Sequence, residues 1–143
     1  MKKLLSLALA LLLLAVMLPV VSMADEITWE ESKNVYWQAG ETSGQTATLA
    51  EALKAAYMAN KGDITITCRP NSDVGSLTHG HVADNITIIG NGAYISGGEC
   101  DLEVDTYQFN RATGVQDENN GVYLEKDITI TVSNLYNLGV WGQ

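Results

Sequence analysis

The chain has 143 residues and a formal net charge of −9, from 8 basic and 17 acidic side chains. A chain this acidic lacks the positive surface that binding to nucleic acid or to anionic lipid requires, so its composition argues against both classes of partner. Its length is typical of one small domain.

Residues 1–24 have the form of a secretion signal. Two lysines precede the apolar run Leu4–Val21, and Ser22-Met23-Ala24 supplies the small residues that a signal peptidase reads. We therefore expect cleavage after Ala24, with no membrane segment afterwards. An uncleaved anchor is the alternative, because the run is nearly long enough to span a bilayer. The signal is bacterial in style and predicts a secreted or cell-surface protein that begins at Asp25. This mature chain has six basic and 17 acidic side chains, which give it a net charge of −11.

Residues 25–46 are predicted to form an N-terminal strand and a loop. Apolar Val35, Trp37 and Ala39 alternate with other residues, which is the two-residue period of a strand. The polar, glycine-containing segment 40–45 indicates a loop.

A capping box, Thr48-Leu49-Ala50-Glu51, predicts that a helix begins after Thr48. In this motif the threonine hydroxyl accepts from the N–H of Glu51, whose carboxylate accepts from the N–H of Thr48. An apolar stripe at helical spacing follows, made of Leu49, Ala52, Leu53 and Ala56. We expect Asn60-Lys61-Gly62 to end the helix, with Gly62 in the left-handed conformation.

Beyond Gly62 the sequence predicts only short strands. One five-residue sequence motif, which we call the phrase, occurs three times. Its copies are Asp63-Ile64-Thr65-Ile66-Thr67, Asn85-Ile86-Thr87-Ile88-Ile89 and Asp127-Ile128-Thr129-Ile130-Thr131. The step from Ile86 to Ile128 is close to twice the step from Ile64 to Ile86. A fixed period of this size indicates a chain that stacks on itself.

We therefore predict an all-β fold, a right-handed parallel β-helix with a short N-terminal capping α-helix, over residues 47–143. The period leaves room for about four coils. Isoleucines of the three copies would stack inside the coils in two columns: Ile64, Ile86 and Ile128, and then Ile66, Ile88 and Ile130. An antiparallel β-sandwich is the alternative, because Gly90-Asn91-Gly92 permits a hairpin. The repetition in phase favours the β-helix.

The helix and the phrases that follow it resemble a known family. Leu49–Ala56, followed by Gly62-Asp63-Ile64-Thr65-Ile66, resembles the opening of pectin-lyase-like right-handed parallel β-helices, and Asn85–Gly97 resembles the coil that follows it. The resemblance covers roughly residues 47–143 and implies the fold. It leaves the activity open, because the family includes pectate lyases, polygalacturonases, other glycosidases, adhesins and repetitive surface proteins.

Members of that family usually have many more coils. We therefore expect this chain to be the N-terminal part of a longer protein, truncated at its C-terminus. Its last strand would then leave an open edge, through which the chain could self-associate.

The run Asp101-Leu102-Glu103-Val104-Asp105 is the candidate metal site. In a strand, its carboxylates would lie on one face, with alternate residues about 7 Å apart. Asp101, Glu103 and Asp105 could then hold a calcium ion with further oxygen ligands, and a pair of them has the spacing of an inverting glycosidase. A solvated acidic face without a ligand is the remaining alternative. We expect no cofactor other than calcium.

Two other pairs of reactive side chains carry less information. His79-Gly80-His81 differs from the Gly-His-Gly element of the family's enzymes and supplies too few ligands for a metal, so we expect two solvated loop histidines. Cys68 and Cys100 could pair in an exported protein or remain two buried thiols, and the sequence leaves both states open.

The expected function is a non-enzymatic role in display, adhesion or carbohydrate contact, with a polysaccharide or another cell-surface component as the partner. Aromatic side chains would supply surfaces on which sugar rings stack. The alternative is the N-terminal part of a polysaccharide lyase or glycosidase whose catalytic coils lie beyond residue 143. For the chain itself we predict no such activity, because no catalytic constellation is recognisable in it.

Overall fold

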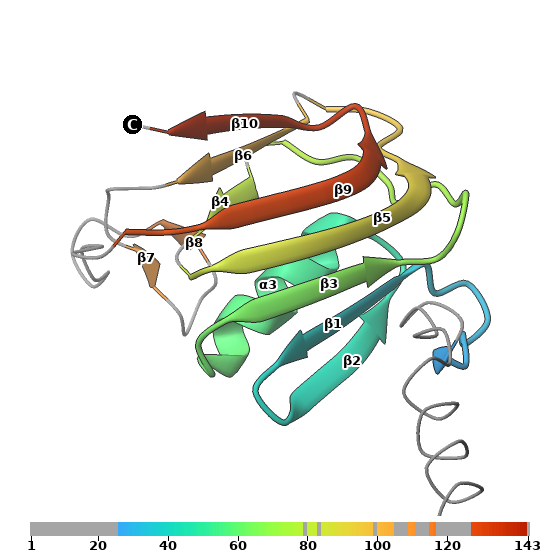
Figure 1. Cartoon of the computed structure of the whole chain (residues 1–143), viewed down its shortest axis with the longest axis horizontal. Coiled ribbons are helices and arrows are strands. Elements are labelled where there is room, and N and C mark those ends of the chain that lie inside the picture. The colour runs from blue at the N-terminus through green and yellow to red at the C-terminus, as the bar shows by residue number, and fades with distance from the viewer. Residues whose placement is uncertain are drawn as a thin grey trace, which may run out of the picture.

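The computed structural model describes residues 26–78, 80–82, 84–98, 100–104, 109–110, 115–116 and 127–142. This part of the chain is rich in strands, which form a five-stranded mixed sheet, a three-stranded parallel sheet and a small hairpin (Figure 1). The elements are β1 (Val35–Ala39), β2 (Thr42–Thr46), α3 (Leu49–Ala59), β3 (Ile64–Cys68), β4 (Gly80–Val82), β5 (Ile86–Tyr94), β6 (Asp101–Val104), β7 (Phe109–Asn110), β8 (Val115–Gln116), β9 (Ile130–Tyr136) and β10 (Gly139–Gly142).

The large sheet begins with an antiparallel hairpin of β1 and β2, and β1 also pairs antiparallel with β3. The predicted strand at Val35–Ala39 is confirmed. The predicted loop at residues 40–45 is wrong, because Thr42–Thr46 forms β2. Only Gly40 and Glu41 make the turn, and Gly40 adopts a φ of 59°. Glycine at a positive φ allows a two-residue turn whose twist matches the flanking strands.

Helix α3 begins as predicted. The Glu51 N–H donates to Thr48 Oγ1 at 3.2 Å, and the Thr48 N–H donates to Glu51 Oε2 at 3.3 Å. The helix also ends at Asn60-Lys61-Gly62 as predicted, and Gly62 has the expected positive φ, 88°. Asn60 precedes it as the C-cap and is itself left-handed, with a φ of 52°. Asparagine tolerates the left-handed region better than most residues do, so the helix ends before the glycine is reached.

Six strands stack in parallel in two sheets. In the large sheet β3, β5 and β9 are successive parallel neighbours. In the small sheet β4, β6 and β10 are parallel in the order β10-β6-β4. The chain therefore passes three times through the large sheet, a bend and the small sheet. We call these segments the first pass (64–85), the second pass (86–129) and the third pass (130–142). Their parallel pairing contradicts an antiparallel sandwich for these strands.

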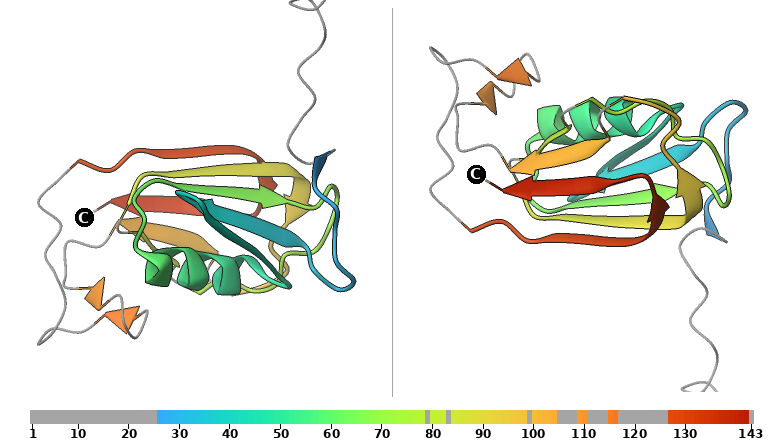
Figure 2. Two further views of the ribbon diagram at one scale, coloured as in Figure 1. Left: turned by 90° about the horizontal axis from the view of Figure 1, so that it is seen from below. Right: turned by 90° about the horizontal axis from the view of Figure 1, so that it is seen from above.

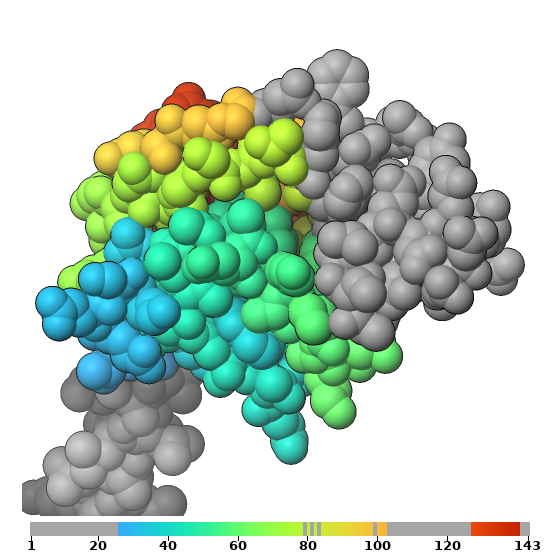
Figure 3. Space-filling view, turned by 180° about the vertical axis from the view of Figure 1, so that it is seen from behind, coloured from blue at the N-terminus to red at the C-terminus, as the bar shows by residue number. Residues whose placement is uncertain are grey.

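The layers follow from this order. Figure 2 shows α3 and the small sheet on the same side of the large sheet. Seen from behind, the described surface runs from the N-terminal hairpin and α3 at one end to the second and third passes at the other (Figure 3). The strands β9 and β10 thus lie at the end of the stack that is farthest from the hairpin.

The register of the third pass differs from the prediction by two positions. Ile64, Ile86 and Ile130 are partners, and so are Ile66, Ile88 and Val132, so Ile128 does not occupy the predicted column. Ile86 and Ile130 are far apart in the sequence, yet their strands are direct neighbours. No strand of the described residues lies between them, so the expected fourth coil is absent from this stack.

An insertion explains the wrong count. In the first pass residues 83–85 connect the end of β4 to the start of β5. In the second pass the much longer segment 105–129 connects the end of β6 to the start of β9. The second connection is longer than the first by the number of residues that separates Ile64 from Ile86. The third phrase therefore lies one repeat length farther along the sequence than expected, which led to the prediction of an additional coil. The sequence also predicts a short strand at residues 121–125, and these residues lie outside the described part of the chain.

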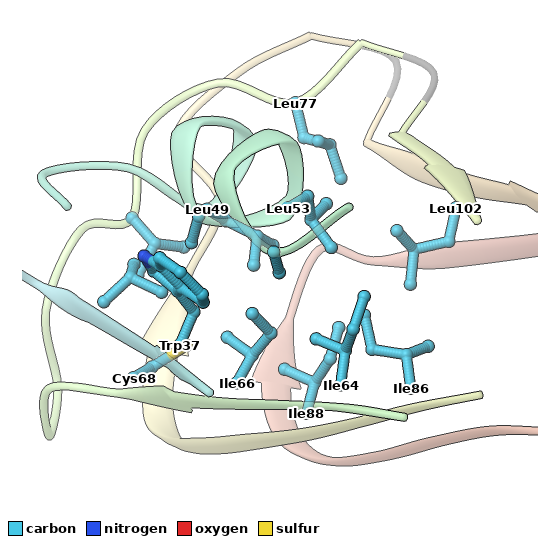
Figure 4. Packing of buried hydrophobic residues seen from close by; sticks show 14 of the residues in the cluster. Trp37, Leu49, Leu53, Ile64, Ile66, Cys68, Leu77, Ile86, Ile88 and Leu102 are labelled. Carbon is cyan, nitrogen blue, oxygen red and sulfur yellow. The ribbon is translucent and has the colours of Figure 1, made fainter. Parts of the chain in front are cut away.

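Apolar side chains fill the space between the large sheet, α3 and the small sheet (Figure 4). Ile66 and Ile88 are 0% exposed, and Leu102 of β6 is also 0% exposed on the facing side. The apolar side chains of the third pass are only partly buried, although they pack against the same core: Ile130, Val132, Leu135 and Leu138. The core is therefore closed by the hairpin and α3 at one end and less covered at the other.

The bend that follows the large sheet is built from asparagines in the left-handed conformation. Asn71, Asn91 and Asn134 have φ values of 54°, 52° and 48°, and the Asn91 amide donates to the carbonyl of Cys68 at 2.9 Å. Residues 90–92, where the sandwich alternative required a hairpin, form a register shift inside the single strand β5, between Ile89 and Ala93. Strand β5 thus has two more residues in this bend than β9 has.

Candidate functional site: an exposed tyrosine column

Two tyrosines lie side by side just beyond the asparagine bend. Tyr94 ends β5 and Tyr136 ends β9, and the two residues are register partners in the parallel pair. Their side chains are 43% and 63% exposed. Since neighbouring strands are about 4.8 Å apart, the two side chains leave the same face of the sheet at close range.

The alternation of the strand directs Tyr94 outward. Its neighbours Ala93 and Ile95 are 0% and 2% exposed and point into the core, so the side chain between them faces solvent. Backbone hydrogen bonds hold the position from both sides. The Tyr94 N–H donates to the Ser72 carbonyl at 3.0 Å, and the Ile95 N–H donates to the Tyr136 carbonyl at 3.2 Å.

Asp73 of the first pass completes the column. It forms a parallel bridge with Tyr94, and its side chain is exposed. The carboxylate is oriented by the Gly75 N–H, which donates to Asp73 Oδ1 at 2.8 Å. We call Asp73, Tyr94 and Tyr136 the tyrosine column.

The chemistry of the column is that of a weakly polar, acidic contact surface. A phenol ring offers an apolar face together with a hydroxyl that both donates and accepts hydrogen bonds. The large apolar side chains that are exposed among the described residues are Met58, Tyr94, Tyr136 and Val140. Half of them belong to the column, and these are the two aromatic ones.

Sequence reasoning missed this pair, although a signal was present. The offset from Tyr94 to Tyr136 is the same as the offset from Ile86 to Ile128, which separates the second and third phrases. In the structure, β5 and β9 pair with this offset only after the bend, from Ala93 onward. Before the bend the offset is two residues larger, because β5 has two additional residues between Ile89 and Ala93. The repeat offset thus aligned the tyrosines correctly and the isoleucines incorrectly.

The predicted calcium ligands are described only in part. Asp101 and Glu103 lie in strand β6, as expected, with Leu102 between them facing the core. The Glu103 side chain and all of Asp105 lie outside what the structure describes. Within its described residues, no three His, Cys, Asp or Glu side chains group closely enough to hold a metal ion. The calcium site remains a prediction.

The histidine segment is a strand where a loop was expected. Gly80–Val82 forms β4 and pairs in parallel with β6, with His81 in register with Glu103. Gly80 permits this close approach, since a Cβ there would lie 2.9 Å from Leu102 Cδ2. His79 and the side chain of His81 lie outside the described part of the chain.

Both cysteines are free thiols. Cys68 lies at the end of β3 with its side chain in the core, and burial raises its pKa to about 12. The half-buried Cys100 donates to the carbonyls of Gly97 and Gly98 at 3.2 and 3.3 Å. The structure therefore holds the two residues at separate places, without a disulfide.

Comparisons with known proteins returned no match to a family model, to a curated protein or to a solved structure. Among the residues that the structure describes, no helix is both long and apolar enough to cross a bilayer.

Proposed function

We propose that this chain is an exported right-handed parallel β-helix of the pectin-lyase-like kind, whose coils contact carbohydrate at the cell surface without catalysing a reaction. Three parallel passes in register support the β-helix, and so does a capped helix at one end of the stack. The secretion signal in residues 1–24 supports export.

The tyrosine column is the observation that carries the proposed role. Tyr94 and Tyr136 present two aromatic side chains to solvent in adjacent positions on paired strands. Aromatic rings at this exposure bind apolar faces of ligands without a large ordering cost, because the backbone already fixes their spacing. Sugar rings have such faces, and their hydroxyls would bond to the phenol hydroxyls and to Asp73.

The charge of the chain favours a neutral polysaccharide over an anionic one. Asp73 places a carboxylate one strand away from Tyr94, and the chain carries 17 acidic side chains against 8 basic ones. A uronic acid polymer would therefore meet like charge both at the column and across the molecule.

Glycan affinity electrophoresis tests the role. The purified protein is run through gels that contain a soluble neutral β-glucan or polygalacturonate, and retardation reports binding. We expect retardation by the neutral glycan, and we expect Tyr94→Ala and Tyr136→Ala each to weaken it about tenfold. The matched control is Met58→Ala, which removes from α3 an apolar side chain that is 46% exposed, close to the 43% of Tyr94, and that lies outside the column.

Two outcomes would contradict the proposal. One is a protein that none of a panel of polysaccharides retards, and the other is unchanged retardation of the Tyr94→Ala/Tyr136→Ala double variant. The alternative, part of a polysaccharide lyase or glycosidase, is tested by incubation with polygalacturonate, where we expect no cleavage. Cleavage that is lost in an Asp101→Asn variant would favour the enzyme.

A further inference from the structure

The last strand of the large sheet and the last strand of the small sheet belong to an uncharged segment. No Asp, Glu, Lys, Arg or His occurs from Ile128 to Gln143, although the chain as a whole has 17 acidic and 8 basic side chains. This segment contains β9 and β10. Proteins commonly place charges, above all lysine, on edge strands to prevent pairing with another chain. These two strands have no such protection.

The hydrogen-bonding groups of β9 point in two directions. The Ile86 N–H donates to the Thr129 carbonyl at 3.0 Å, and Ile86 is in register with Ile130. In a parallel ladder alternate residues bond to the same neighbour, so Thr129, Thr131 and Ser133 direct their backbone groups toward β5. The N–H and C=O groups of Ile130 and Val132 therefore face away from the described sheet.

The burial of apolar side chains also decreases toward this edge of the stack. Ile86 and Ile88 are 1% and 0% exposed, while their partners Ile130 and Val132 are only partly buried. In the small sheet Leu102 is 0% exposed, while its partner Val140 is 53% exposed. The end of the stack thus offers two neutral strand edges with apolar side chains between them.

We propose that two copies of this chain associate through this end, with β9 of each copy pairing antiparallel to β9 of the other around a twofold axis. An axis perpendicular to the large sheet would bring the two β10 edges together at the same time, because the layers of the two copies then coincide. The contact places no charged residue of Ile128–Gly142 against its own copy. A self-complementary patch of this kind is what a twofold dimer requires.

A head-to-tail contact is less favourable because the other end of the stack has a different structure. The outer strand there is β2, and α3 occupies the layer that faces it. The Gln45 side chain of β2 also bonds to the backbone of Thr28 and Glu30, at 2.9 and 3.1 Å. Strand β10 would therefore meet a helix, which has no free edge with which to pair.

A pair of double variants tests the contact in the exported chain by sedimentation velocity over a concentration series. Thr131→Lys/Ser133→Lys adds two positive charges to the exposed face of β9. Thr65→Lys/Thr87→Lys adds the same charge to the same face on β3 and β5, where both edges of each strand are already paired. The two variants thus have equal net charge, and only the edge variant places its lysines on the last strand. It also removes the bond that the Ser133 hydroxyl donates to the Ile88 carbonyl at 3.4 Å, so folding of both variants is checked.

We expect a reversible dimer for the unchanged chain and for the control variant, and a dissociation constant about tenfold higher for the edge variant. Circular dichroism verifies that both variants are folded. Should the edge variant unfold, amide exchange of the unchanged chain supplies the test, since protection of Ile130 and Val132 should rise with protein concentration.

Other outcomes would overturn the proposal. A monomer at all concentrations, with Ile130 and Val132 exchanging rapidly, would show that the edge does not pair. Protection of these amides in a monomer would show that another part of the same chain covers the edge. Open-ended polymers would show a head-to-tail contact in place of the twofold one.

Discussion

At the scale of single residues, burial decides which member of the repeated phrase matters for stability. Ile88 is 0% exposed and contacts the core, whereas the adjacent Thr87 is exposed. We predict that Ile88→Ala lowers the free energy of unfolding by about 2–5 kcal/mol, through lost burial and the cavity left behind. Thr87→Ala should change it by less than about 0.5 kcal/mol. Urea denaturation measures both values, and similar losses for the two variants would contradict the burial pattern.

The thiol of Cys68 makes stability depend on pH in alkaline solution. Burial raises the pKa of Cys68 from 9.0 to about 12, so the folded state keeps the neutral thiol while the unfolded chain ionises near pH 9. The unfolded state thus holds fewer protons between these two pH values, and stability falls as the pH rises through this range. We predict that urea midpoints fall from about pH 8 to about pH 10 more steeply for the unchanged chain than for Cys68→Ala. Equal slopes would show that Cys68 is accessible to solvent.

At the scale of elements, the capping box of α3 is the clearest case of a local rule. Thr48 Oγ1 accepts from the Glu51 N–H, a group that has no other partner within the helix. We predict that Thr48→Ala lowers the free energy of unfolding by about 1 kcal/mol. Thr48→Ser keeps the hydroxyl and should retain most of that energy. Thermal denaturation compares the two variants, and an equal loss would assign the effect to the threonine methyl group.

The elements that were predicted correctly are those that local patterns specify. The start of α3 depends on Thr48 and Glu51 alone, and β3 and β5 depend on a β-branched run inside the phrase. Strands β2 and β4 have no such pattern, since Thr42–Thr46 is polar and Gly80–Val82 is short. These two segments are strands because they pair with β1 and β6, respectively. Non-local pairing of this kind cannot be read from a window of sequence.

The candidate site was missed for a related reason. The register of the third pass depends on the long connection 105–129 and on two additional residues in the bend of β5, and both act over long separations. The acidic run of β6 drew attention because its residues are adjacent in sequence. Tyr94 and Tyr136 are distant in sequence, and only the stacking of β5 on β9 brings them together.

At the scale of the whole molecule, the stack should be unevenly stable along its axis. Strand β3 has neighbours on both edges, β1 and β5, whereas β9 has a described neighbour on one edge only. Because opening of an end strand disrupts fewer contacts, we predict faster amide exchange in β9 and β10 than in Ile64–Cys68 in dilute solution. Exchange measured by NMR or mass spectrometry at low concentration, where a dimer dissociates, tests this gradient. Uniform protection from Ile64 to Gly142 would contradict it.

The long connection of the second pass has a consequence for how this protein can change in evolution. Residues 105–129 lead from the small sheet of the second pass to the large sheet of the third pass, as residues 83–85 lead from the small sheet of the first pass to the large sheet of the second. Loop closure depends only weakly on length, so sequence can be gained or lost at this position at little cost to the strands beside it. Removing residues 105–126 would leave Asp127-Ile128-Thr129 as a connection of the earlier length. We therefore expect a chain without residues 105–126 to form the same stacked passes, which circular dichroism and thermal denaturation of the shortened chain would test.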